Sequence, residues 1–210
     1  MHSVTARYYG CIKYCDELIG RIVEKLKQKN LLDDTIIIVT ADHGESMTEH
    51  GILFDHHGLY DPTTRVPLIL RYPPIGKGVH EGLSMNLDIT PTILDLLGID
   101  KKFKERDGKS LAKQFNKEIS RDFIFSEENY LQKKFSVRSK THKLIYPQKG
   151  FEGCIRCGYA HGGEFELYDL EQDPDENKNI YDKNSAKAEE LSKKGKDFFK
   201  KKSVIEGIRI

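Results

Sequence analysis

The stretch Thr35-Ile-Ile-Ile-Val-Thr-Ala-Asp-His-Gly-Glu45 places an apolar, β-branched run directly before an acid, an imidazole and a glycine. A short run of this kind, bounded by turn signals, predicts a buried strand of a mostly parallel sheet. In open α/β sheets, ligands bind just beyond the carboxyl ends of such strands. Gly44 allows a sharp turn there without a Cβ clash. Asp42 and His43 are therefore the chain's best candidates for holding a divalent cation.

The segments on either side of this strand predict an α/β fold. Residues 5–29 carry apolar side chains at helical spacing on one face, which we interpret as a buried face, and Asn30 provides a left-handed stop. A second apolar strand is expected at residues 66–71. Between the two strands, residues 46–64 are polar and contain histidines, as expected of an active-site loop. A second helix is expected at residues 88–98.

The second half of the chain has a different pattern, in which short strands follow one another without helices between them. This pattern predicts a small antiparallel sheet with a C-terminal helix. We therefore expect a partial α/β catalytic domain in residues 1–104 and a small α+β subdomain in residues 105–210. The strands are expected at residues 122–127, 135–139, 142–146 and 164–169, and the terminal helix at 185–202.

The composition excludes several classes of partner. The chain has 210 residues, 32% charged residues and a formal net charge of +1, which argues against broad attraction to nucleic acid or a membrane surface. No stretch is long enough to span a bilayer, and the first residues lack the apolar core of a signal peptide. We expect no nucleic-acid or membrane partner and, for the chain as written, a cytoplasmic location.

The four cysteines are too few for a disulfide scaffold. Cys11 and Cys15 lie four residues apart on the expected buried helix face, where we interpret them as small core residues. Cys154, Cys157 and His161 have the spacing of zinc ligands, but they provide only three of the usual four. A surface loop with an incidental cysteine pair is the alternative that we favour for this segment.

Several stretches, in this order, resemble those of one protein family: Tyr14–Arg21, Thr35–Glu45, Glu49–Gly51, Leu59–Ile69, Asp88–Thr92 with Leu97–Ile99, and Leu167–Pro174. The chain resembles the C-terminal half of a sulfatase, within the alkaline-phosphatase-like superfamily. The resemblance covers most of the chain. It implies an α/β enzyme that hydrolyses sulfate esters at a calcium site.

The resemblance also implies roles for particular residues. Asp42 and His43 match the acid and the following Asn or His that bind the metal in the family. A hard cation such as calcium prefers oxygen ligands, so the imidazole leaves zinc and manganese as alternatives. The structural alternative for this pair is a capped turn with a hydrogen-bonded imidazole.

His56 stands where family members carry a lysine that contacts the sulfate, and His57 lies beside it. An imidazolium can hold an anionic oxygen or protonate the departing alcohol, so both are candidate catalytic residues. The alternative is a loop histidine bonded to backbone or solvent. Glu45, His50 and Arg65 receive no catalytic role, and Arg65 is expected to pair with Asp61 or Glu45.

The family's nucleophile lies in a Cys/Ser-x-Pro-x-Arg motif, and the 210-residue sequence contains no such motif. We expect a C-terminal portion whose partner is the missing N-terminal half, arising from a truncated gene prediction, a split gene or a shortened expression fragment. The alternatives are a metal-dependent phosphodiesterase, phosphonate hydrolase or phosphotransferase of the same superfamily, or a non-catalytic remnant that binds a partner, or the complementing half of a split enzyme. The chain alone is expected not to turn over an aryl sulfate.

Overall fold

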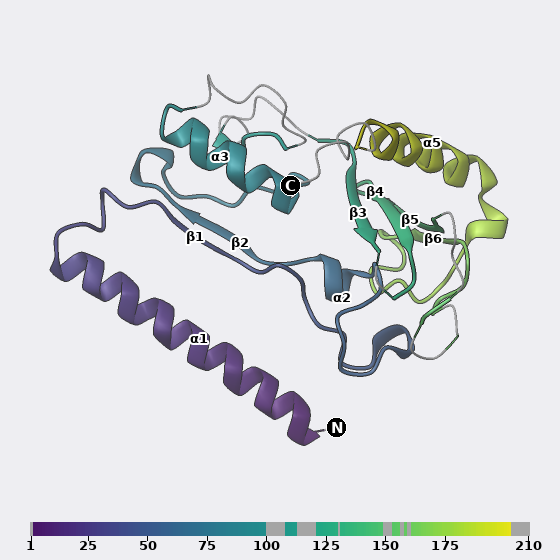
Figure 1. Cartoon of the computed structure of the whole chain (residues 1–210), viewed down its shortest axis with the longest axis horizontal. Helices are drawn as coiled ribbons and strands as arrows, with labels where there is room; N and C mark the ends of the chain where they lie inside the picture. The colour runs from purple at the N-terminus through teal and green to yellow at the C-terminus, as the bar shows by residue number, and fades with distance from the viewer. Residues whose placement is uncertain are drawn as a thin grey trace. The chain divides into compact units, whose positions relative to one another are not determined.

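The protein is described here by a computed structural model that covers residues 2–99, 108–112, 121–129, 131–148, 153–155, 158 and 161–202. The chain forms two compact units, Met1–Ala41 with Pro67–Gly78, and Asp42–Val66 with Val79–Ile210 (Figure 1). The expected boundary between residues 1–104 and 105–210 lies outside the described residues, so that division stays a prediction.

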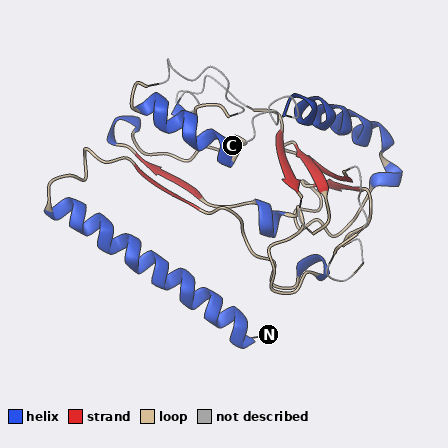
Figure 2. Ribbon diagram, in the orientation of Figure 1, coloured by secondary structure: helices blue, strands red, loops and turns tan. Residues whose placement is uncertain are grey.

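The first unit contains one long helix and a two-stranded ribbon (Figure 2). Helix α1 spans His2–Gln28, and Asn30 follows it with a φ of 55°, in the left-handed conformation expected of a helix stop. Strands β1 (Ile37–Thr40) and β2 (Leu68–Arg71) pair with Ile37 opposite Arg71 and Thr40 opposite Leu68.

The pairing of β1 with β2 is antiparallel, whereas the sequence suggested a mostly parallel sheet. No parallel pair occurs among the strands of the described residues. A parallel pairing of neighbours needs a long crossover, usually a helix, and the segment between β1 and β2 contains only the short helix α2 (Asp61–Thr64) and one turn of 3₁₀-helix (Glu49–Gly51). Antiparallel edge strands are common on otherwise parallel sheets.

The predicted buried face of α1 is exposed over much of its length, while Leu18, Ile19, Val23 and Leu26 are half-buried. Cys11 and Cys15 are both exposed, which corrects their interpretation as core residues. Ile12 and Ile22 expose 50% and 62% of their surface. The helical periodicity was correct, but periodicity shows only that a face is apolar and does not show that the face is buried.

The second unit is built on a four-stranded antiparallel sheet in the order β3-β4-β5-β6, as predicted for the second half of the chain. Each strand pairs with the next one in sequence, and the connections from β3 to β4 and from β4 to β5 are short. Helix α5 lies along one face of this sheet (Figure 1). The elements are β3 (Ile124–Glu128), β4 (Lys134–Arg138), β5 (His142–Pro147), β6 (Glu166–Asp169) and α5 (Ser185–Lys202).

Alternation along the strands gives the sheet two buried faces. Leu144 and Tyr146 of β5 belong to the core beneath α5, which includes Leu191 of the helix. Ile145, between them, points to the opposite face and packs with Tyr60 from the loop that follows β1. The sheet thus holds the candidate active-site loop on the face opposite the C-terminal helix.

Buried charges fix this loop to the sheet. Lys134 is 2% exposed and donates to Glu166 at 2.8 Å. The other carboxylate oxygen of Glu166 accepts hydrogen bonds from the hydroxyl groups of Tyr60 at 2.6 Å and Tyr168 at 2.7 Å. Fully buried charges persist only when they are paired and hydrogen-bonded. Two of the family-like stretches, around Tyr60 and Tyr168, therefore meet at one carboxylate.

Helix α3 (Ile89–Leu96) is positioned through the buried carboxylate of Asp88. Asp88 accepts hydrogen bonds from the backbone N–H groups of Met85 and Lys109 at 2.8 and 2.7 Å. Gly98 follows the helix with a φ of 68°, which a residue with a side chain adopts only under strain. None of the described helices is both long and apolar enough to cross a bilayer.

Candidate active site

Asp42 and His43 follow strand β1 directly after Ala41. The backbone N–H of His43 donates to Asp42 Oδ1 at 3.0 Å, and this bond lowers the pKa of the Asp42 carboxyl below its ordinary value. The Asp42 side chain is 88% exposed. It is therefore a charged carboxylate that is open to a ligand from solvent.

The imidazole of His43 is oriented by its own loop. Its Nδ1 lies 2.8 Å from the carbonyl oxygen of Gly44, so an Nδ1–H donates there and leaves the Nε2 lone pair available to a cation. Nε2 lies 3.6 Å from Asp42 Oδ2. The two predicted ligands thus face a common point, and their assignment as metal ligands stays a prediction.

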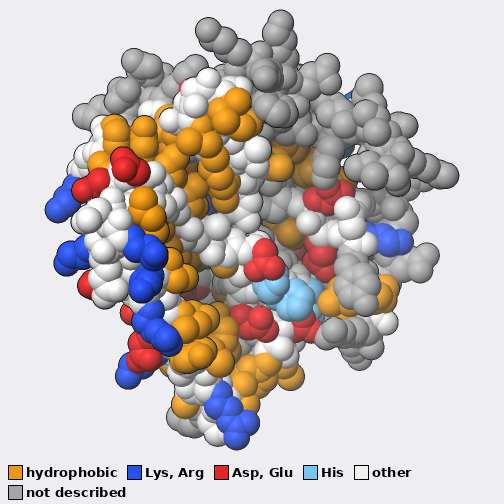
Figure 3. Space-filling view, turned by 60° about the vertical axis from the view of Figure 1, so that its left-hand side comes forward, with side chains coloured by type: hydrophobic (Ala, Val, Ile, Leu, Met, Phe, Trp, Pro, Cys, Tyr) orange, Lys and Arg blue, Asp and Glu red, His pale blue; other side chains and the backbone are white. Residues whose placement is uncertain are grey.

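A local bridge brings the next candidates to the same place. Ser46 and Asp55 exchange backbone hydrogen bonds of 2.9 and 3.2 Å, which sets Glu45 beside His56. The ring of His56 stacks on that of His43 with centroids 4.2 Å apart. The ligand atoms of His43, Glu45 and His56 all lie within 4.8 Å of one another. Histidines lie among acidic side chains on an open face of the molecule (Figure 3).

Gly44 is required here because the backbone approaches α2 closely. Its N–H donates to the carbonyl oxygen of Thr63 at 2.8 Å, and a Cβ at this position would lie 2.1 Å from the carbonyl oxygen of Pro62. The space for a side chain is therefore filled by backbone. The glycine joins the Asp42–His43 turn to the segment that begins at Tyr60.

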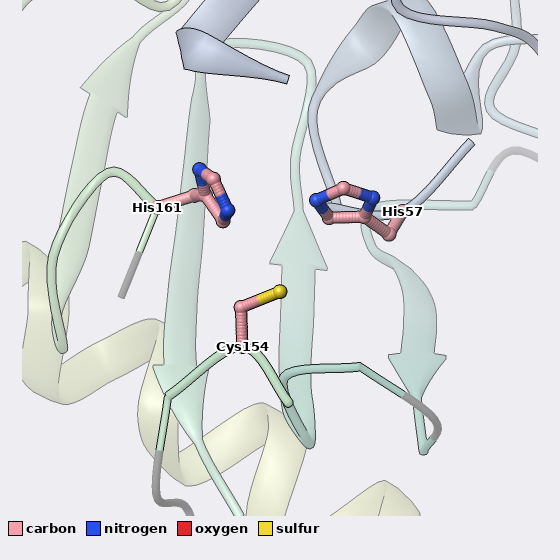
Figure 4. Close-up of side chains that lie close together, drawn as sticks. All are labelled: His57, Cys154 and His161. Carbon is pink, nitrogen blue, oxygen red and sulfur yellow. The ribbon is translucent and has the colours of Figure 1, made fainter. Parts of the chain in front are cut away.

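His57 points away from this group, although it is adjacent to His56. His56 is 58% exposed, whereas the side chain of His57 is only 9% exposed. The ligand atoms of His57, Cys154 and His161 all lie within 4.8 Å of one another (Figure 4). The predicted histidine pair is thus divided between two places, and the catalytic assignment of either residue stays a prediction.

Asp61 does not have the partner that the sequence suggested. Its carboxylate pairs with Lys143 at 2.6 Å and with Arg138, not with Arg65, which is exposed. Burial acts to raise the pKa of Asp61, but the Lys143 ammonium and the Arg138 guanidinium outweigh it and lower the pKa. Both cations come from strands far along the chain, which explains why nearby Arg65 was the wrong choice.

His50 has a packing role. Its ring stacks on the ring of Tyr60 with centroids 3.7 Å apart, and burial lowers its pKa. Glu45, to which the sequence assigned no catalytic role, contacts His56 at 4.0 Å, and Asp55, which the sequence did not single out, contacts it at 3.5 Å. The acid directly after the Asp-His-Gly turn was the available signal for Glu45.

The comparisons with known proteins agree on one family. The family model described as "Sulfatase" matches residues 2–99. An N-acetylglucosamine-6-O-sulfatase of Bacteroides thetaiotaomicron is 31% identical over 188 residues, which are 84% of this chain and 32% of that protein. A choline-sulfatase of Rhizobium meliloti is 30% identical over 82% of this chain and 32% of its own length.

Solved structures give the same result. A structure described as a complex with its substrate D-glucosamine-2-N,6-O-disulfate aligns with a TM-score of 0.75 at 28% identity, over 89% of this chain and 39% of that chain. A phosphonate monoester hydrolase of Agrobacterium radiobacter aligns with a TM-score of 0.72 at 27% identity, over 89% of this chain and 39% of that chain. The chain spans about one third of the length of the curated relatives that it matches.

Proposed function

The chain belongs to the sulfatase family, and from this premise we propose that it contributes the Asp42–His43 side of an active site that hydrolyses sulfate esters. The alkaline-phosphatase-like fold class predicted from the sequence is confirmed by the alignments with sulfatase structures. The observation that carries the proposal is the convergence of Asp42 Oδ2 and His43 Nε2, 3.6 Å apart, within the segment that matches the family.

The donor set fits a divalent cation. Asp42 and Glu45 offer carboxylate oxygens, and His43 and His56 offer imidazole nitrogens, all near the surface. Oxygen donors suit calcium, the ion that the family resemblance implies, while the imidazoles suit zinc or manganese equally well. The bound ion would stabilise the negative charge that develops on the sulfate oxygens.

Each residue has a role that follows from its position. Asp42, charged and open to solvent, and His43, held with Nε2 outward, would bind the ion. His56 would contact a sulfate oxygen or pass a proton to the departing alcohol, because it is exposed beside His43. His57 is less suited to direct catalysis, because its ring is buried against other groups.

The nucleophile is proposed to lie outside this sequence, which has no Cys/Ser-x-Pro-x-Arg motif. The remaining metal ligands would come from an N-terminal portion outside this sequence; the part matched here makes up 32% of each of two relatives. Sulfated amino sugars are the first substrates to assay, since one relative is named for such a substrate and a related structure contains one.

A phosphonate or phosphate ester hydrolase is the second candidate. It is favoured by the alignment with a phosphonate monoester hydrolase and by a multifunctional alkaline phosphatase superfamily protein of Trinickia caryophylli that is 29% identical. The same metal side of the site would serve either reaction. The substrate that is turned over distinguishes the two.

Metal binding by the purified chain tests the proposal. Calcium and manganese titrations by calorimetry should show binding that is weakened more than about tenfold by Asp42→Asn and by His43→Ala, because each removes a ligand. Asp175→Asn, at an exposed turn, is the matched control and should bind as the wild type does. If Asp42→Asn and His43→Ala bound the metal with the affinity of the wild type, the metal assignment would be refuted.

Activity is tested by co-expression with the coding region directly upstream in the genome. An active complex should hydrolyse 4-nitrophenyl sulfate and 6-O-sulfated N-acetylglucosamine, whereas the chain alone should not. Preferential turnover of phenyl phosphonate by that complex would favour the second candidate instead. Metal-dependent sulfate release by the chain alone would contradict the proposed division of the site.

A further inference from the structure

A second group of potential metal ligands lies outside the candidate active site. His57, Cys154 and His161 each offer a ligand atom, and these atoms all lie within 4.8 Å of one another. The three residues come from separate segments, and their side chains surround a common space (Figure 4). The Cys154 residue is 2% exposed, so its thiol is not an ordinary surface group.

The His57 ring is the feature that packing alone does not explain. Its side chain is 9% exposed, and neither Nδ1 nor Nε2 has a hydrogen-bond partner. A buried polar group without a partner destabilises the fold, so this arrangement is unfavourable unless a further group binds the ring. One ring nitrogen is turned toward Cys154 and His161 (Figure 4).

Asp55 completes a pattern that is common at metal sites. Its Oδ2 lies 3.5 Å from His57 Nδ1, which leaves Nε2 for a metal ion. Metal-binding histidines usually present their second ring nitrogen to a carboxylate, which fixes the tautomer and makes the ligand more basic. A small adjustment of the His57 ring would turn this 3.5 Å approach into a hydrogen bond.

The backbone at Cys154 and His161 is held by hydrogen bonds to neighbouring residues. The backbone N–H of His161 donates to the side chain of Gln132 at 3.1 Å, and its carbonyl oxygen accepts from Lys134 Nζ at 3.0 Å. The N–H of Ile155, next to Cys154, donates to the carbonyl oxygen of Leu131 at 3.0 Å. The backbone at these two ligands is therefore set before any ion binds, so less ordering is required on binding.

We propose that His57, Cys154 and His161 bind one Zn²⁺ ion at a site separate from the Asp42–His43 site. One thiolate and two imidazoles suit zinc and disfavour calcium and magnesium, which take oxygen ligands. Bond lengths of about 2.0–2.3 Å place tetrahedral ligand atoms about 3.3–3.8 Å apart. Since the ligand atoms now lie within 4.8 Å of one another, each pair contracts by about 1.5 Å at most when zinc binds. The thiol releases its proton to solvent as the ion binds.

The consequence of this site is mechanical. The ion would tie the segment that carries His56 and His57 to the segments around Cys154 and His161. Asp55 also lies 3.5 Å from His56 Nδ1, through its Oδ1, so the same carboxylate contacts both histidines. Zinc at the second site would thus stabilise the loop from which His56 extends, whatever substrate the active site takes.

Cobalt and zinc binding to the purified chain test this proposal. Metal-free protein titrated with Co²⁺ should show the near-ultraviolet absorption of a thiolate–cobalt bond, and zinc measured by mass spectrometry should show one equivalent that Cys154→Ser removes. His161→Asn should weaken binding more than about tenfold while the backbone contacts of residue 161 remain. The matched controls are Cys11→Ser and His142→Asn, which should bind as the wild type does.

The outcomes separate this site from the first one. Asp42→Asn should leave the thiolate–cobalt absorption unchanged, because Asp42 belongs to the other site. The zinc site is therefore tested independently of the active-site proposal. The zinc-site proposal would be overturned if the wild type showed no thiolate–cobalt absorption, or if Cys154→Ser showed the same absorption as the wild type. If Cys154→Ser fails to fold, His161→Asn and His57→Asn decide, and wild-type affinity in both would likewise overturn it.

Discussion

Glu166 is one of the buried side chains that hold the candidate active-site loop against the sheet. It is fully buried, with an ion pair of 2.8 Å to Lys134 and hydrogen bonds from Tyr60 and Tyr168. We predict that Glu166→Gln lowers the free energy of unfolding by about 3 kcal/mol, because the Lys134 charge stays buried without its carboxylate. Urea unfolding at pH 7 measures this change. The exposed control Glu171→Gln should change stability by less than about 0.5 kcal/mol, and an equal effect of both would contradict the account.

Asp61 gives the fold a pH dependence with a definite sign. Its pKa is lowered in the folded state, since Lys143 and Arg138 outweigh the effect of burial. The unfolded chain therefore binds the proton more readily, and the stabilisation is present above the unfolded pKa of about 3.9 and is lost as the pH falls through the folded pKa. Asp61→Asn should lose about 2 kcal/mol at pH 7 and progressively less as the pH falls below about 4.

Unfolding free energies of the wild type and Asp61→Asn, measured between pH 3 and 7, check this prediction. Glu176 faces the same lysine and acts in the opposite direction, because burial raises its pKa and its ionisation opposes folding. The comparison with Asp61→Asn is therefore needed to isolate the contribution of Asp61. A difference between the two proteins that grows toward pH 3 would have the wrong sign.

Only some residues of the candidate site could be predicted from the sequence. Asp42 and His43 were identified from their place after an apolar run, which is a local signal. The grouping of His57 with Cys154 and His161 depends on chain segments far apart in sequence, and no local pattern reports such a contact. The ion pair of Asp61 with Lys143 was missed for the same reason.

At the scale of elements, the exposed apolar residues of α1 lead to a testable prediction. Ile12 and Ile22 lie exposed on its apolar face. Large exposed apolar faces lead to association in water. We predict that the purified chain self-associates, and that replacing Ile12 and Ile22 by Ser lowers its average mass in light scattering while leaving Tm within about 2 °C. Replacing the exposed residues Lys13 and Gln28 by Ser is the control and should change neither the mass nor the Tm. A compact wild-type monomer would contradict the prediction.

Most elements followed from the sequence because their signals are local. The helix expected at residues 5–29 corresponds to α1, and the one expected at 185–202 has the bounds of α5. The four short strands of the second half pair antiparallel in sequence order, as their succession without helices predicts. The burial of Lys134 and Lys143 inside strands was not predictable, because it depends on carboxylates from other elements.

At the scale of the whole molecule, the pairing of β1 with β2 and the exposed face of α1 have one explanation. The chain spans about one third of the length of its curated relatives. We propose that the parallel neighbours of β1 and the cover of the exposed part of α1 lie in a portion that the relatives contain and that this sequence does not include. The sequence predicted the sheet type of the complete family domain, whereas the structure of this chain contains an antiparallel pair from it.

The central claim is that Asp42 and His43 share one cation, and a crystal grown with Mn²⁺ tests it most directly. Anomalous scattering should locate one ion within about 2.5 Å of both an Asp42 carboxylate oxygen and His43 Nε2. An ion bound elsewhere, or an Asp42 side chain turned away from the imidazole in the presence of saturating manganese, would contradict the account.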